Sequence, residues 1–274
     1  MADELERVRK ALRDLGKILK NLPEDPAPKD VHKLRTTTRR VEAIAAVLSP
    51  GDGKKSRRLL KPIEPVRKAA GDVRDMDVLA ANARRLARYS AGESLTRLLQ
   101  HLTTARQQYA VGLHTAVNHK RKAARQNLKD FAKLVKPAMA PAGASQNGQP
   151  ELSHEGVQAS AMNLRRELAA WPPLDAGNVH AFRLKVKELR YTLQLDANAD
   201  PALVDTLTDV QRRIGDWHDW QQLAEIAREV LLTKEDAALR QRIETTAKRK
   251  LDRALTAANG LRGKYLAAPL ATGA

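Results

Sequence analysis

Apolar residues recur every three or four positions through most of the 274-residue chain, a spacing that predicts helices rather than strands. In the first half the pattern predicts helical segments at 3–21, 31–48, 54–89 and 93–136. In the second half it predicts them at 153–171, 178–196, 201–232 and 234–264. The stretch PAMAPAGASQNGQP separates the halves and has the composition of a linker. We therefore predict a first domain at 1–136, a linker at 137–150 and a second domain at 151–274.

The second predicted helix of each half carries cations on one side and apolar residues on the other. These helices read VHKLRTTTRRVEAIAAVL from Val31 and VHAFRLKVKELRYTLQL from Val179. On a helical projection, polar side chains of the later segment share an arc of about 100°: His180, Arg183, Lys187, Arg190 and Tyr191. We call this set the second cationic face. Aligning Val31 with Val179 gives the first cationic face, formed by His32, Arg35 and Arg39.

A second match supports an internal repeat, because VRKAAGDVRDMDVL at 66–79 aligns with VQRRIGDWHDWQQL at 210–223. Both contain Gly-Asp-x-x-Asp, and we expect its carboxylates to be mainly structural, as partners of cations or as caps: Asp72, Asp75, Asp216 and Asp219. The predicted fold is all-α, with two four-helix-bundle repeats related by pseudo-twofold symmetry around a basic channel.

The composition agrees with an all-helical fold and indicates in which cellular compartment the protein is expected. Aromatic residues make up only 3% of the chain, so strand formers are scarce. The absence of cysteine excludes disulfides and thiolate metal sites and fits a reducing compartment. The charged N-terminus lacks the apolar core of a signal peptide, and no run is apolar enough to span a bilayer. We expect a cytoplasmic protein without a membrane partner.

The charge indicates a polyanionic partner. The chain holds 49 Lys and Arg against 32 Asp and Glu, a net charge of +17. Residues 1–136 hold 31 basic and 15 acidic residues, so the first half carries almost all of the excess. Nucleic acid, an acidic membrane surface and a phosphate polymer all fit such a charge, and simple solubility is the alternative without a ligand.

The paired His-x-x-Arg-x-x-x-[Arg/Lys] helices, each followed by Gly-Asp-x-x-Asp, resemble the CHAD domain, the conserved histidine α-helical domain. The resemblance extends from about Leu5 to Lys264. It implies a helical bundle that binds inorganic polyphosphate along a basic channel and associates with polyphosphate granules. By position, the implied ligands are His32, Arg35 and Arg39 in the first half and His180, Arg183, Lys187 and Arg190 in the second.

The chain departs from the family pattern at Glu42, where a basic residue is often found. A carboxylate there would repel an anion unless it pairs with Arg39 or with a residue of another helix. We expect Arg57, Arg58 and Lys61 to compensate, and we add Tyr191 as the aromatic residue of the second cationic face. In a crystal, sulfate or phosphate is expected to occupy the site. No cofactor and no metal are predicted.

Nucleic-acid binding is the main alternative, because the excess of basic residues is typical of nucleic-acid-binding proteins. The sequence contains no recognisable nucleic-acid-binding module, however. Low aromatic content argues against single strands, which need stacking platforms. A metal-dependent phosphohydrolase, prompted by His218-Asp219, is weaker because Arg74 stands at the equivalent position of the first half. No phosphate-binding glycine loop or catalytic triad is recognisable, so we expect no enzyme. A scaffold that docks a partner on segment 93–136 is a further reading.

Overall fold

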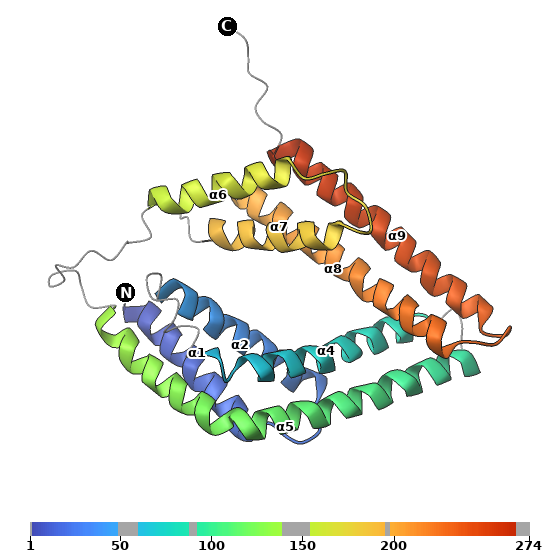
Figure 1. Ribbon diagram of the computed structural model, residues 1–274, viewed down its shortest axis with the longest axis horizontal. Helices are drawn as coiled ribbons and strands as arrows, with labels where there is room; N and C mark the ends of the chain where they lie inside the picture. Colours follow the sequence, from blue (N-terminus) through green and yellow to red (C-terminus); the bar gives the residue numbers. More distant parts are fainter. Residues whose placement is uncertain (1, 49–59, 88–91, 139–153, 195–197, 267–274) are drawn as a thin grey trace, which may run out of the picture. The chain divides into compact units, whose positions relative to one another are not determined.

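The computed structural model describes residues 2–48, 60–87, 92–138, 154–194 and 198–266, and these form helices joined by turns and short connections, without a strand (Figure 1). The all-α prediction is confirmed. In the first half the helices are α1 (Ala2–Asn21), α2 (Pro28–Leu48), α4 (Glu64–Arg85) and α5 (Glu93–Ala138). In the second they are α6 (His154–Ala169), α7 (Val179–Leu193), α8 (Pro201–Val230), α9 (Ala237–Leu261) and a short π-helix, η1 (Arg262–Leu266).

The predicted helices and the observed ones agree closely where both can be compared. Pro62 lies in the turn before α4 and Pro65 lies in its first turn, where a missing backbone N–H costs nothing. The long periodic segment forms one uninterrupted 46-residue helix, α5, which spans roughly 70 Å. Asp200 caps α8, because its side chain accepts a hydrogen bond of 2.9 Å from the backbone N–H of Ala202.

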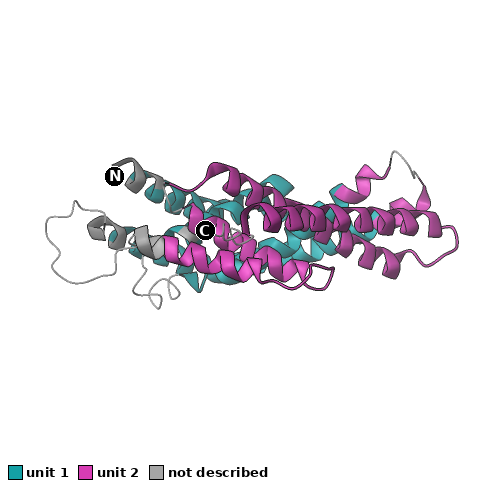
Figure 2. Cartoon of the chain, turned by 90° about the horizontal axis from the view of Figure 1, so that it is seen from above, with its two compact units in different colours: residues 1–81, 99–150 teal, residues 82–98, 151–274 magenta. Residues whose placement is uncertain are grey.

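The chain forms two compact units, shown in teal and magenta in Figure 2. The first contains residues 1–81 and 99–150, and the second contains residues 82–98 and 151–274. Residues 82–98, which the sequence pattern places with the first half, thus group with the second unit. The predicted linker, 137–150, lies almost wholly outside the described residues.

Each unit has its own apolar core, and the cores determine how α2 and α7 are rotated about their axes. In the first unit, Val31, Leu34 and Val41 of α2 are buried. In the second unit, Phe182 of α7 is completely buried and meets Trp171 edge-to-face, with ring centroids 5.7 Å apart. Because these stripes are buried, the polar side of each helix is turned away from its core.

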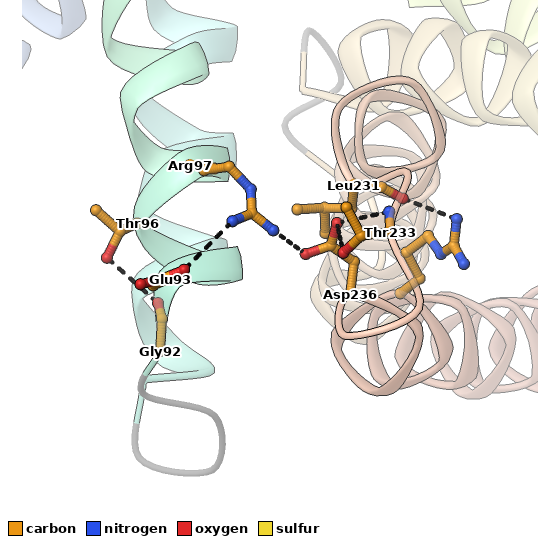
Figure 3. Close-up of polar contacts among 8 residues, drawn as sticks. Gly92, Glu93, Thr96, Arg97, Leu231, Thr233 and Asp236 are labelled. Atoms are coloured by element: carbon orange, nitrogen blue, oxygen red, sulfur yellow. Dashed lines mark hydrogen bonds and ion pairs between the residues drawn. The ribbon is translucent and has the colours of Figure 1, made fainter.

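A buried carboxylate organises the turn between α8 and α9, at Asp236 (Figure 3). The backbone N–H and the hydroxyl of Thr233 both donate to its Oδ2 at 3.0 Å. The guanidinium of Arg97, from the first turns of α5, pairs with Oδ1. Hydrogen bonds from Ser94 and Thr233, together with the charge of Arg97, hold the pKa of Asp236 well below its usual range. The contact ties the beginning of α5 to the α8–α9 turn.

We predict that Asp236→Ala lowers Tm at pH 7 by several degrees, whereas Glu229→Ala, at an exposed position of α8, leaves it almost unchanged. The pKa of Asp236 is lower in the folded chain than in the unfolded one. Its stabilisation is therefore complete above about pH 4 and is lost as the pH falls further. Thermal unfolding of wild type and variant from pH 7 toward pH 2 should show the Tm difference shrinking. A difference that does not vary with pH would contradict this account.

Candidate functional site

The first cationic face lies on α2, within the first unit. His32 and Arg39 are exposed, whereas Arg35 is half-buried. Thr38, on the apolar side of the helix, is buried and satisfies its hydroxyl by donating to the carbonyl oxygens of Leu34 and Arg35 at 3.0 and 2.9 Å. The helix thus presents a half-buried guanidinium between an exposed imidazole and an exposed guanidinium.

Arg35 lies among charges of its own sign. Burial lowers its pKa, and the neighbouring charges of Arg39, Arg67 and Arg74 lower it further, while Asp75 acts in the opposite direction. Burial also raises the pKa of Asp75, which reduces the tendency of that carboxylate to stay ionised. Packing therefore holds more positive than negative charge at this point, and a bound anion would relieve the repulsion.

A glycine of the neighbouring helix makes room for the arginine in each unit. A Cβ added at Gly71 of α4 would lie 2.8 Å from Nη1 of Arg35. A Cβ added at Gly215 of α8 would lie 3.1 Å from Nη2 of Arg183. The sequence marks both glycines as members of the Gly-Asp-x-x-Asp repeat, but it does not show that they accommodate the arginines of the preceding repeat motif. Their place in the middle of predicted helices, where glycine is unfavourable, was a signal in the sequence from which a packing role could have been inferred.

The second cationic face lies on α7, within the second unit. Arg183 is half-buried, and its Nε donates to the carbonyl oxygen of Gln211 on α8 at 3.1 Å, which fixes the plane of the guanidinium. Lys187 and Arg190 are half-buried, and both cations lie over the exposed ring of Tyr191. The Arg190 Cζ is 4.7 Å and the Lys187 Nζ 5.6 Å from the ring centroid, so Tyr191 orients two of the predicted ligands.

His218 of α8 lies beside this face, although it was not among the ligands predicted from the sequence. Its ring centroid is 4.9 Å from that of the exposed His180. Burial lowers the pKa of His218, and the charges of His180 and Arg183 lower it further. In the repeat alignment His218 takes the place of Arg74. The charge of Arg74 acts on Arg35, and the charge of Arg183 acts on His218, so both positions lie close to the arginine of their own unit. The alignment of His218 with the basic residue Arg74 was the signal in the sequence that could have placed His218 beside the second cationic face.

The charge of Glu42 is neutralised by a residue of another helix, which is one of the two alternatives expected from the sequence. Its Oε1 lies 2.7 Å from Nε of Arg67, a residue of α4, in a charge contact that lacks aligned hydrogen-bond geometry. Of the residues expected to compensate, Lys61 is exposed in the turn before α4. Arg57 and Arg58 lie outside the described residues. The carboxylate of Glu42 therefore faces a cation within its own unit.

The structure assigns a structural partner to one repeat carboxylate. Asp216 Oδ2 lies 2.5 Å from Nζ of Lys250 on α9, which agrees with the expectation that Asp216 pairs with a cation. Lys250 is thus a partly buried structural residue. Among the described residues, no group of three or more His, Asp or Glu side chains is placed to hold a metal ion. None of the described helices combines the length and apolarity required to cross a bilayer.

These features define a class: an all-helical protein in which arginines of two equivalent helices pack against glycines of the helices that follow them. The CHAD domain family model matches residues 6–228, and the chain belongs to this family. The resemblance seen in the repeat motifs is thereby confirmed. No curated protein and no solved structure matches the chain significantly.

The glycine contacts generate a prediction in which stability and binding change in opposite directions. Alanine favours a helix interior over glycine by about 1 kcal/mol, and only the flexible end of an arginine obstructs the new methyl group. Gly71→Ala and Gly215→Ala should therefore keep or raise Tm. If the cationic faces bind the phosphate polymer that the family resemblance implies, both substitutions should weaken that binding about 3- to 10-fold, the loss of roughly one hydrogen bond, because the guanidiniums are displaced.

Gly112→Ala is the matched control, since a Cβ at that position of α5 meets nothing within 4 Å. It should raise Tm without changing binding. Calorimetric titration with polyphosphate and thermal unfolding of all three variants check the prediction. Unchanged affinity in both Gly71→Ala and Gly215→Ala would contradict it.

Proposed function

We propose that this protein binds inorganic polyphosphate through the two cationic faces and does not chemically alter the polymer. The observation that supports this most directly is the position of Arg35 and Arg183. Each guanidinium is half-buried against a glycine, and other basic residues lie beside it in its own unit. Membership of the CHAD family, which is associated with polyphosphate, supports the same ligand.

The chemistry of the faces fits a repeating phosphate anion. Arginine donates bidentately to phosphate oxygens, and lysine contributes a point charge. Along α7, Arg183, Lys187 and Arg190 follow one another at about one helical turn, roughly 5 Å. Such a row can follow a polymer that carries charge at regular intervals, whereas it offers no pattern for reading base edges.

We further propose the finer architecture predicted from the sequence. In it, two four-helix repeats related by a pseudo-twofold axis present both faces to one basic channel, and sulfate or phosphate can occupy the same sites. We also propose a role at polyphosphate granules in the cytoplasm. The stoichiometry of binding as a function of polymer length distinguishes a shared channel from two separate sites, because only a shared channel lets one long chain engage both faces.

In a direct competition titration at physiological salt, we expect long-chain polyphosphate to displace duplex DNA of equal charge. Exposed charges contribute mainly a screened, nonspecific attraction, whereas the half-buried arginines meet phosphate from fixed directions. Arg35→Ala and Arg183→Ala should each reduce polyphosphate binding by about 1–3 kcal/mol. Arg183→Lys should restore only part of the loss, because the charge returns without the planar fork.

The control is Arg84→Ala, which removes an exposed cation of α4 and should cost little. DNA that binds as tightly as polyphosphate would favour the nucleic-acid alternative. Equal losses at positions 35, 84 and 183 would indicate a diffuse charged surface. Polymer recovered after incubation with Mg²⁺ or Mn²⁺ should keep its length. Phosphate release that disappears in a point variant would refute the non-enzymatic part of the proposal.

Affinity should rise as the pH falls from 8 to 5.5, because imidazolium forms and adds charge to the faces. The pKa of His218 is lowered in the free protein, so its charge is acquired at lower pH than usual. A bound phosphate favours the protonated form, and binding should therefore take up protons. Calorimetry in buffers of different ionisation enthalpy measures this uptake. The uptake should fall in His218→Ala, and an unchanged uptake in that variant would contradict the assignment.

A further inference from the structure

A second basic surface lies in the first unit, on residues that belong to neither cationic face. A groove of about 560 Å³ runs between α1 and α5. Its floor is apolar and shallow, formed by Leu12, Gly16, Leu128 and Ala132. Seven cations and no acidic residue complete the lining: Arg9, Arg13, Lys17 and Lys20 on α1 and Arg125, Lys129 and Lys133 on α5. We call this surface the α1/α5 groove.

The cations form two rows, one along each side of the floor. On α1 they follow at intervals of four, four and three residues, and on α5 at intervals of four, so each row lies on one face of its helix. Within the described part of the chain, only two of the seven take part in an ion pair. Arg13 pairs with Glu6 at 2.5 Å and Lys133 with Asp130 at 3.7 Å, and all four side chains are more than half exposed.

The floor is open at its centre. A Cβ added at Gly16 would meet no atom within 4 Å beyond its own helix and neighbours. Leu12 and Leu128 are almost completely buried beneath it, so the accessible apolar surface comes from Gly16, Ala132 and the aliphatic stems of the flanking cations. A small residue at the centre of a groove, with apolar residues on both sides, admits the close approach of another backbone.

We propose that the α1/α5 groove binds an acidic amphipathic helix of a partner protein. Such a helix would place its apolar stripe on the floor and its Glu or Asp side chains against the two cationic rows, the arrangement of helix-in-groove recognition. The row from Arg9 to Lys20 spans about 17 Å, which accommodates roughly three helical turns. The site is separate from the polyphosphate faces and does not depend on them.

Charge and shape favour this occupant over the others. Polyphosphate would pair with the cations but gain nothing from the apolar floor. A single anionic acyl chain has one head group, which uses only part of two rows. A bilayer surface is bound by apolar side chains that protrude, whereas these are recessed between the rows.

The test uses the full chain and a synthetic helix of about 15 residues, with leucines at i, i+3, i+4 and i+7 and glutamates on both flanks. Its control has the same composition with the leucines scrambled, so that charge is preserved and the apolar stripe is lost. In fluorescence anisotropy at physiological salt, we expect the amphipathic peptide to bind about tenfold or more tightly than the scrambled one. Equal binding of the two peptides would overturn the proposal.

Gly16→Leu should fill the floor and reduce peptide binding about tenfold, whereas Gly16→Ala should change it little. A Cβ at position 16 meets no atom within 4 Å, and a Tm no lower than that of the wild type, together with unchanged polyphosphate affinity, would verify that both variants are folded. Lys17→Glu/Lys129→Glu should also weaken binding of the peptide, because the new carboxylates repel its glutamates. Insensitivity to Gly16→Leu would refute the site.

Two further outcomes would replace the partner helix by another ligand. Competitive displacement of the peptide by polyphosphate, with polyphosphate binding weakened by Lys17→Glu/Lys129→Glu, would make the groove a polymer site. Binding to vesicles that contain anionic lipid, strengthened by the added side chain in Gly16→Leu, would make it a membrane contact. In either case the proposal fails, whereas the function of the two cationic faces is tested separately.

Discussion

The contact between an arginine of one helix and a glycine of the next governs the candidate binding surface in both units. A larger residue at position 71 or 215 would occupy the space that the guanidinium of Arg35 or Arg183 now fills. Glycine weakens a helix interior, so each unit loses some helical stability at this point. In return, a long flexible side chain is held in one place, and the loss of conformational entropy on binding an anion is smaller. The absence of a side chain at each glycine thus determines where the guanidinium charge lies.

Holding cations together without a ligand has an electrostatic cost that the core must offset. Burial lowers the pKa values of Arg35 and His218, and the cations beside each of them lower these values further. The buried stripes of α2 and α7 supply the opposing apolar stabilisation, because they fix the rotation of each helix. A polyanion would then reduce the repulsion and add stability to the folded chain. Under the proposed function, binding and folding would be linked through these few residues.

Sequence patterning was sufficient for the helices, because apolar periodicity and proline positions report directly on local structure. It also identified the two cationic faces, since residues three and four apart share a helix face. It was not sufficient for contacts between helices. The pairing of Glu42 with Arg67 was left as one of two alternatives, Lys250 did not stand out as the partner of Asp216, and His218 was set aside. Those contacts depend on packing between segments distant in sequence, which periodicity does not encode.

The two units are not interchangeable with the two halves of the chain. Both α4 and α5 cross from one unit to the other, α4 after residue 81 and α5 after residue 98. A fragment cut in the linker would carry Asp236 without Arg97 and would leave a buried carboxylate lacking its cation. The continuous hydrogen-bonded backbone of α5 also joins the units in one cooperative element. Shortening the protein at its most obvious boundary, the linker, would therefore remove part of what stabilises the second unit.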